Sequence, residues 1–154
     1  MLRRETSVKW IVIALIALIL ITALGLLANF KKDVTYVQVG NQSVTARLAD
    51  TPEEREKGLS GTRELKPNEG MLFIFDKPDT WGIWMKEMNY KIDVLWIDED
   101  NKIVAIERNV SPETYPKIFN PDKKAKYILE VPAGFADRAD AGLYTIVSFR
   151  SWLW

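Results

Sequence analysis

The segment of residues 81–93, WGIWMKEMNYKID, brings two tryptophans, a lysine and an aspartate close together. Because side chains alternate between the two faces of a strand, two neighbouring strands around the EMNYK connection would place Lys86 and Asp93 close to each other. Two interpretations are open. The charges form an exposed ion pair that contributes about 0–1 kcal/mol, or Lys86, beside Trp84, binds an anion or serves as a catalytic base.

The chain contains neither histidine nor cysteine among its 154 residues. These absences exclude an imidazole base, a Ser–His pair, a thiolate nucleophile, a disulfide and a zinc site built on those residues. A hard cation held by oxygen atoms is compatible with the composition, and DEDN (98–101) places carboxylates close together. This segment lacks the glycine and the distal glutamate of a calcium loop. We therefore predict a hairpin turn there, and we expect no metal and no cofactor.

The charged residues are balanced, with 21 lysines and arginines against 21 aspartates and glutamates. Without the first thirty residues the balance is 18 to 20, a net charge of −2. Proteins that bind nucleic acids present basic stripes to the phosphate backbone, and the sequence contains no such stripe. We expect no nucleic-acid partner.

Residues 10–28, WIVIALIALILITALGLLA, contain no charged side chain. At about 1.5 Å per residue this helix would measure about 28 Å, close to the thickness of the hydrocarbon layer of a bilayer. Apolar residues surround the whole helix, whereas an amphipathic helix has a polar face. A cleavable signal peptide is the alternative, but its apolar region is shorter, about 7–15 residues, and ends in a cleavage site. We predict an uncleaved transmembrane anchor over residues 10–30.

Basic residues flank this anchor unequally. Arg3, Arg4 and Lys9 precede it, and Lys31 and Lys32 follow it. The excess of one positive charge, together with the amino terminus, favours an orientation with the N-terminus inside the cell. The remaining chain would then lie outside the cytoplasmic membrane, with the lipid bilayer as its first partner.

The predicted organisation therefore has four parts. They are a short cytoplasmic tail (1–9), a transmembrane anchor (10–30), a linker (31–35) and a β-rich extracytoplasmic domain (36–154).

Short-range signals define the first elements of the domain. Alternating apolar residues in VTYVQV and SVTARL predict two strands joined by a turn at Gly40-Asn41. In the following DTPEEREKG, Thr51 is expected as a helix N-cap, Glu54 completes a capping box and Gly58 ends the helix.

The rest of the domain is predominantly β. Further strands are expected over residues 70–75, 81–85, 92–97, 102–110, 125–131 and 143–150. A proline-rich loop is expected over 111–122, and one helical turn in PAGFADRADAG. Short strands at spacings of about ten residues are typical of sandwiches and barrels. We predict a mostly β, single-domain sandwich with one or two short helices.

Five sequence blocks occur in a characteristic order: EEREKGLSG, GMLFIF, IWMKEM, IDVLWID and YILEVPAG. In this order they resemble the prokaryotic family called domain of unknown function 192, over about residues 36–150. The family typically reads E-R-x-x-G-L-M, G-M-L-F-x-F, F-W-M-K-N-T, P-L-D-x-x-F-x-D and V-L-E-V-x-A-G. Its members commonly follow a signal peptide or a membrane anchor. The resemblance implies a compact sandwich of the jelly-roll type and implies no particular reaction.

The resemblance also marks four charged residues of this chain. They are Arg55, Lys86, Asp93 and Glu130. Either they converge on one cleft, or they form buried pairs that stabilise the fold, because a buried charge without a partner costs several kcal/mol. Ser60 stands where the family usually has methionine, and without histidine GLSG is not a nucleophile elbow.

Three functional hypotheses follow. The first is a binding or accessory module at the cell envelope. In it Arg55, Trp84 and Lys86 line the ligand side, and Asp93 and Glu130 orient the positively charged groups of Arg55 and Lys86. The second is an enzyme on envelope polymers with Asp93 and Glu130 as an acid–base pair, which requires carboxyl groups about 5–9.5 Å apart. The third is a structural domain that docks onto another membrane protein.

The ligand of the first hypothesis is a small envelope molecule or a glycan. Flat aromatic side chains bind the apolar faces of sugars, and a surface of Trp81, Tyr115 and Phe119 would do so. Packing of these rings in the core is the alternative.

Overall fold

A computed structural model describes residues 9–10, 13–20, 22 and 34–150. The chain divides into two compact units, Met1–Asp33 and Val34–Trp154. The described residues of the first unit are helical. Among the residues that the structure describes, no helix is long and apolar enough to cross a membrane.

The predicted anchor extends beyond these described residues. Residues 11–12, 21 and 23–30 of it lie outside them, as do most of the predicted tail and the first part of the linker. The anchor and its orientation therefore stay predictions.

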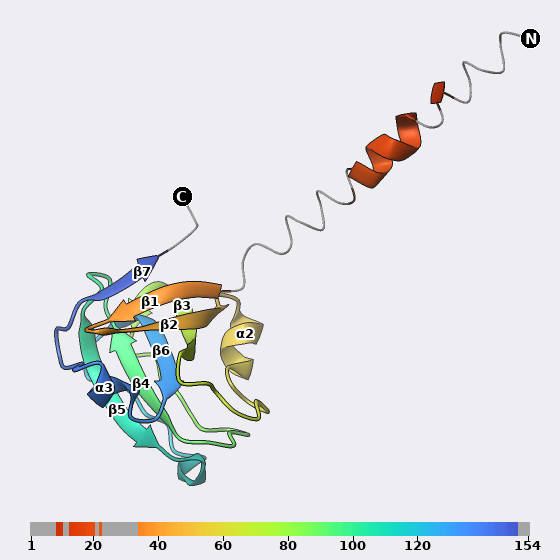
Figure 1. Ribbon diagram of the computed structural model, residues 1–154. Coiled ribbons are helices and arrows are strands. Elements are labelled where there is room, and N and C mark those ends of the chain that lie inside the picture. The colour runs from red at the N-terminus through yellow and green to blue at the C-terminus, as the bar shows by residue number, and fades with distance from the viewer. Residues whose placement is uncertain (1–8, 11–12, 21, 23–33, 151–154) are drawn as a thin grey trace, which may run out of the picture. The chain divides into compact units, whose positions relative to one another are not determined.

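The second unit is built on one seven-stranded sheet (Figure 1). In the sheet, the strands follow the order β5-β4-β6-β3-β2-β1-β7. Neighbouring strands are antiparallel except β2 and β3, which are parallel. The strands are β1 (Val34–Val39), β2 (Gln42–Ala49), β3 (Glu69–Asp79), β4 (Ile92–Ile97), β5 (Ile103–Val110), β6 (Ala125–Pro132) and β7 (Val147–Arg150).

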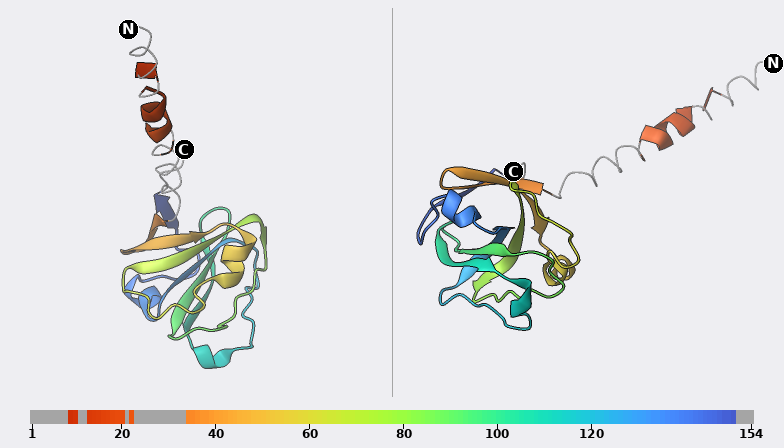
Figure 2. Two further views of the ribbon diagram at one scale, coloured as in Figure 1. Left: turned by 90° about the vertical axis from the view of Figure 1, so that its right-hand side faces the viewer. Right: turned by 60° about the horizontal axis from the view of Figure 1, so that its bottom comes forward.

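The sheet curls until its two ends meet (Figure 2). Lys102, just before β5, forms a bridge with Ile146, just before β7. The backbone N–H of Ile103 donates to the carbonyl of Thr145 at 3.0 Å. The prediction of a mostly β domain is confirmed. The strands belong to one curled, barrel-like sheet, however, whereas a jelly-roll sandwich has two packed sheets.

The sheet is buried on both faces at its centre. Along β4, Leu95 and Ile97 belong to an inner core, which the curled sheet encloses, and Ile92, Val94 and Trp96 belong to an outer core. All six residues of β4 are buried. The predicted strand over residues 92–97 is therefore confirmed, its side chains alternate between the two cores, and each fully buried Leu or Ile contributes about 1.5–3 kcal/mol.

The β1–β2 hairpin forms as predicted, with its turn at Gly40-Asn41. Gly40 has a φ of 52°, and a Cβ atom there would lie 2.0 Å from the carbonyl oxygen of Ala139. Only glycine allows this approach, because it has no side chain and adopts positive φ readily.

The predicted helix also forms, as α2 (Pro52–Lys57). The side chain of Thr51 accepts a hydrogen bond from the backbone N–H of Glu54, and the Glu54 carboxylate accepts one from the N–H of Thr51. This capping box satisfies backbone donors that have no partner within the helix. Gly58 follows with a φ of 49° and ends the helix.

The predicted strand over residues 81–85 is wrong. The segment makes one isolated bridge, Ile83 to Phe119, and crosses the outer face of the sheet. Both edges of β3 and both edges of β4 are already paired, so no edge beside them is free for another strand. Ile83 and Met85 fill the outer core, while Trp84 is 41% exposed.

The remaining predictions differ only at their ends. The strands over 102–110 and 125–131 and the hairpin turn at 98–101 are confirmed. The loop over 111–122 is confirmed too, with the short 3-10 helix η1 (Pro112–Thr114) inside it. One helical turn forms as α3 (Phe135–Arg138). The last strand begins at Val147 rather than at residue 143.

Candidate functional site

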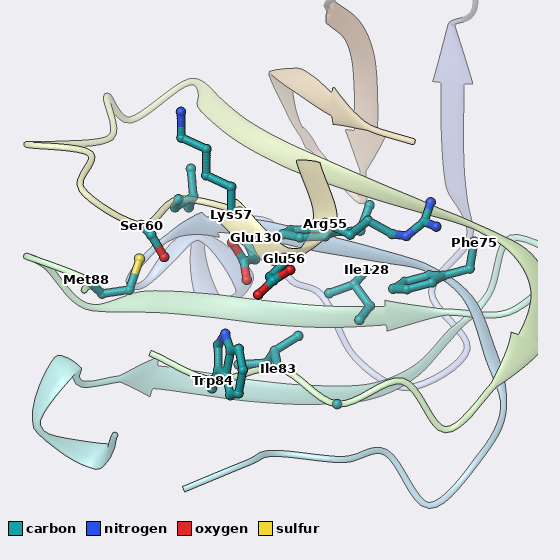
Figure 3. A pocket seen from close by; sticks show the side chains of 14 residues that line it. Arg55, Glu56, Lys57, Ser60, Phe75, Ile83, Trp84, Met88, Ile128 and Glu130 are labelled. Carbon is teal, nitrogen blue, oxygen red and sulfur yellow. The ribbon is translucent and has the colours of Figure 1, made fainter. Parts of the chain in front are cut away.

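A pocket of about 230 Å³ opens on the outer face of the sheet (Figure 3). It lies over β3 and β6, between α2 with the loop that follows it and the segment before β4. Its lining comes from Arg55 to Ser60, from Phe73 and Phe75 of β3, from Gly82 to Trp84, from Met88, and from Ile128 and Glu130 of β6.

Glu130 contributes a buried carboxyl group to this pocket. It is 5% exposed and lies opposite Met71 of β3 and Val94 of β4. Within the described part of the chain its carboxyl group forms no hydrogen bond and no ion pair. Burial raises the pKa of Glu130 to about 8, because a charged carboxylate loses its hydration there. Near neutral pH this group is therefore largely a neutral acid.

Arg55 connects the helix to the sheet. Its Nη1 donates to the carbonyl oxygens of Asp50 at 2.7 Å and of Ile74 at 2.8 Å. Its guanidinium also lies 5.2 Å from the ring centroid of Phe75. In Figure 3 the guanidinium points away from Glu130. The aliphatic part of Arg55 thus lines the pocket, and the hydrogen bonds of its guanidinium hold α2 against β3.

The side chains of the two residues after Arg55 point in different directions. In Figure 3 the carboxylate of Glu56 is directed toward the centre of the pocket, whereas the ammonium of Lys57 points away from it. The acidic side chains of the lining therefore face the cavity and its basic side chains do not.

Trp84 forms the opposite wall. Its ring is an edge-on neighbour of Tyr115, with centroids 6.4 Å apart and an interplanar angle of 71°. The Nζ of Lys86 lies 5.7 Å from the centroid of Trp84. The carbonyl of Lys86 accepts a hydrogen bond of 2.8 Å from the hydroxyl of Ser60. Lys86 is half-buried and stands beside the pocket without lining it.

Asp93 lies on the other face of the sheet. In the register of β4 and β6, Val94 is opposite Glu130 and Asp93 is opposite Val131. Asp93 is fully buried, and its two carboxylate oxygens accept hydrogen bonds of 2.9 Å from the backbone N–H groups of Asn109 and Ala136.

A β-bulge brings the first of these donors into place. The register of β4 with β5 shifts between Ile92 and Val94, so that residues 108 and 109 face Asp93 together. A bulge bends the strand locally, and here the N–H of Asn109 bonds to the carboxylate. The second donor, Ala136, is in the first turn of α3. Asp93 therefore joins its own strand, β4, to β5 and to α3 on the inner side of the sheet.

Two predictions about Asp93 are consequently wrong. It forms no ion pair with Lys86, because the segment before β4 is no strand and the two side chains belong to different faces. It also cannot act with Glu130 as an acid–base pair, because the sheet itself separates the two carboxyl groups. The alternative of two buried ion pairs fails too, since the described chain contains no ion pair among the four marked charges.

The predicted aromatic surface does not form. Trp81 stacks on Phe75 with centroids 4.3 Å apart, and its indole N–H donates to the carbonyl of Lys77. Phe119 is 7% exposed and belongs to the outer core. Of the three predicted rings only Tyr115 is exposed, and its neighbour is Trp84.

The structure thus brings three of the five predicted site residues, Arg55, Trp84 and Glu130, to one pocket and places Lys86 at its side. Sequence reasoning missed Glu56, Phe75 and Met88, which also line it. Nothing in EEREKG distinguishes Glu56 from a solvated helix residue, so no local signal indicated it. In the described ranges, no group of three acidic side chains is placed to hold a metal ion.

Comparison with known proteins identifies the family to which the chain belongs. The sequence model of DUF192, described as "Uncharacterized ACR", matches residues 35–143. No curated protein matches the chain.

Two solved structures share the fold. A proposed transcription regulator from Sinorhizobium meliloti 1021 is 27% identical, with a TM-score of 0.73 over 77% of this chain and 95% of that protein. A protein of unknown function from Novosphingobium aromaticivorans DSM 12444 is 26% identical, with a TM-score of 0.68 over 75% of this chain and 84% of that protein. These two crystallised proteins are therefore similar in fold to this chain over about three quarters of its length.

Proposed function

The chain belongs to the DUF192 family, and we propose that its β domain is a small-ligand-binding module that the apolar N-terminal segment tethers to the outer face of the cytoplasmic membrane. Ligands bind in the pocket between α2 and Trp84. The tether is supported by the uncharged residues 10–28 and by the basic residues before them.

One observation carries the binding proposal. Glu130 lines a pocket, its side chain is buried, and its carboxyl group has no protein partner in the described chain. A buried polar group without a partner costs about 1–3 kcal/mol, and a purely structural role for Glu130 offers no interaction that offsets this cost. A ligand that bonds to the carboxyl group supplies such an interaction.

A thermal-shift screen of the full-length protein in dodecyl maltoside micelles tests this proposal. The compounds are envelope glycan fragments, small anions, small amines and calcium. A ligand at one hundred times its Kd stabilises the folded state by about 2.7 kcal/mol. We expect stabilisation by at least one class, and we expect it to be lost in Glu130→Gln. The matched control is Glu113→Gln, which changes an exposed glutamate of η1.

The outcome that contradicts the proposal is equally plain. If no compound stabilises the protein, or if the stabilisation is unchanged in Glu130→Gln, the pocket is not a binding site.

The tether has a separate test. Protease treatment of spheroplasts should digest the β domain while the cytoplasmic membrane is intact, and fractionation should recover the full-length chain with the membranes. Recovery of the chain in the aqueous cytosol would contradict the tether and leave the pocket proposal unaffected.

A second candidate function is acid catalysis on an envelope glycan. It is favoured by the two carboxyl groups that line one pocket, Glu56 and Glu130, and by the raised pKa of about 8 that leaves Glu130 able to donate a proton. Turnover of fluorogenic glycosides by the wild type, with loss of turnover in Glu130→Gln and in Glu56→Gln, would support it. Binding of the same glycosides without turnover would restrict the pocket to recognition.

A further inference from the structure

We propose that the pocket recognises an organic ammonium group, which pairs with the carboxylate of Glu130 and lies against the ring of Trp84. This inference rests on the proposed binding function and names the chemical class of its ligand.

The direction of the charged side chains is the first argument. Two acidic groups, Glu56 and Glu130, face the cavity, whereas the charged ends of Arg55 and Lys57 point away from Glu130 (Figure 3). The guanidinium of Arg55 is already engaged with the carbonyls of Asp50 and Ile74. An entering ligand therefore meets carboxyl groups first, and a cation is the group that they bind most strongly.

The aromatic wall is the second argument. Trp84 is 41% exposed and faces the pocket from the side opposite α2. Cations are attracted to the face of an indole ring, and the protein itself already places one there, since the Nζ of Lys86 lies 5.7 Å from the ring centroid. A carboxyl group and an aromatic ring that line the same pocket are an arrangement suited to an ammonium ion.

The size of the pocket limits the ligand. Pockets for drug-sized ligands measure about 300–1,000 Å³, and this pocket measures about 230 Å³. It accommodates one compact group of a few heavy atoms. The ammonium group can therefore come from a free amine, from an amino sugar or from a phosphoethanolamine head group, with the rest of a larger molecule outside.

Pairing with a cation changes the protonation of Glu130. In the free protein its pKa of about 8 keeps it largely protonated at pH 7. Binding of an ammonium ion requires the carboxylate, so binding releases a proton and the affinity rises with pH until Glu130 is ionised in the free protein. A ligand that accepts a hydrogen bond from the neutral acid shows the reverse dependence, with affinity lost above about pH 8.

Other titratable or charged groups lie around Glu130 on the outer face of the sheet. They are Glu56, Arg55 and Lys57 from α2, Lys86 and Tyr90 from the segment before β4, Arg47 of β2 and Glu69 of β3. Burial raises the pKa of Tyr90 above its ordinary value, so that Tyr90 keeps its proton over the pH range in which Glu130 ionises.

The test is an NMR titration of the full-length, ¹⁵N-labelled protein in dodecyl maltoside micelles with three matched probes: propylamine, 1-propanol and propionate. We expect amide shifts at Gly58, Ser60 and Glu130 and an indole shift at Trp84, caused by propylamine alone. Its affinity should rise about tenfold between pH 6 and pH 7 and level off above pH 8. Glucosamine, N-acetylglucosamine and O-phosphoethanolamine then distinguish the sources of the ammonium group.

Two variants sharpen the result. Glu130→Gln should reduce the affinity for propylamine at pH 8 at least tenfold and abolish its pH dependence, and Glu113→Gln should change neither. Equal affinity for propanol or propionate, or an affinity for propylamine that falls with pH, overturns the ammonium proposal while the binding function stands. Absence of pocket shifts with every probe, together with a negative thermal-shift screen, overturns both.

Discussion

Two buried carboxyl groups lie on neighbouring strands of the sheet and face opposite sides of it. On the inner side, Asp93 accepts hydrogen bonds from two backbone N–H groups, one on β5 and one on α3. On the outer side, Glu130 opens onto a pocket and has no partner in the described chain. The sequence presents both as acids within hydrophobic strands, so the difference comes entirely from what the fold brings to each face.

This comparison separates a structural charge from a functional one. A carboxylate that accepts charge-assisted hydrogen bonds from backbone groups stabilises the elements that it joins. A buried carboxyl group without partners destabilises the folded state and retains its capacity to bond. Asp93 therefore explains how the domain is held together, and Glu130 indicates where it binds.

Removal of the inner carboxylate should have the largest effect on stability. Asp93→Ala leaves two backbone N–H groups without an acceptor, that of Asn109 in a part-buried place and that of Ala136 in a buried one. Each hydrogen bond to a charged group contributes about 1.5–3 kcal/mol, so we expect a loss of about 3–5 kcal/mol in the free energy of unfolding, measured by urea denaturation of the full-length protein.

The control for this variant is Asp98→Ala. Asp98 also accepts two backbone hydrogen bonds, in the turn between β4 and β5, but it is only half-buried. A loss of about 1 kcal/mol is expected there, because water replaces the missing acceptor. Similar losses in the two variants would mean that burial on the inner face is not what makes Asp93 important.

The outer carboxyl group should make stability depend on pH. The pKa of Glu130 is about 8 in the folded protein and about 4.5 in the unfolded chain, so the folded state binds more protons between these values. The free energy of unfolding should therefore fall by about 1.4 kcal/mol per pH unit as the pH rises toward 8, and level off above it. Relative to wild type, Glu130→Gln should become progressively more stable over that range.

Urea denaturation of both proteins at pH 5, 6, 7, 8 and 9 measures this difference. A difference that stays constant with pH would show that Glu130 is hydrated or paired in the folded protein, and it would remove the contrast between the two carboxyl groups.

Arg55 should have an intermediate effect. Arg55→Met retains the stem that lines the pocket and removes the hydrogen bonds to the carbonyls of Asp50 and Ile74. We expect a loss of about 1–2 kcal/mol, since the site is partly exposed, with little change in ligand affinity. A large loss of affinity without a loss of stability would assign the guanidinium to the ligand instead.

The smallest effect on stability is expected for Lys86→Met. The contact of Lys86 with Trp84 is half-exposed and contributes about 0.5–1 kcal/mol. Because this variant frees one face of the ring, the affinity for propylamine should stay the same or rise a few-fold in the NMR titration. A loss of several kcal/mol would support the structural-docking hypothesis, in which the charged residues serve only the fold.

Much of the fold follows from local signals. The turn at Gly40-Asn41, the capping box of Thr51 and Glu54 and the strand over residues 92–97 each depend on residues close in sequence, and all three are confirmed. The strand expected over residues 81–85 fails because alternation also suits a segment that crosses a core. Only the pairing of β3 and β4 with other strands shows that no edge is available to it.

The candidate site was predictable only in part. Sequence blocks indicated Arg55, Trp84 and Glu130, which line the pocket, together with Lys86, which stands beside it. They also indicated Asp93, which belongs to the other face. Glu56 had no distinguishing signal, because a glutamate on a short helix is usually solvated, and its direction depends on how α2 packs over β3.

The sequence by itself determined the chemical repertoire and the local elements: no imidazole and no thiol, an uncharged N-terminal segment, a capped helix and a set of short strands. The tertiary structure alone decided which carboxyl group is satisfied and which is left facing a cavity. The physical reason is that hydrogen-bond partners and burial come from segments far apart in the chain, and a shift of one residue in strand register exchanges the two faces of a sheet.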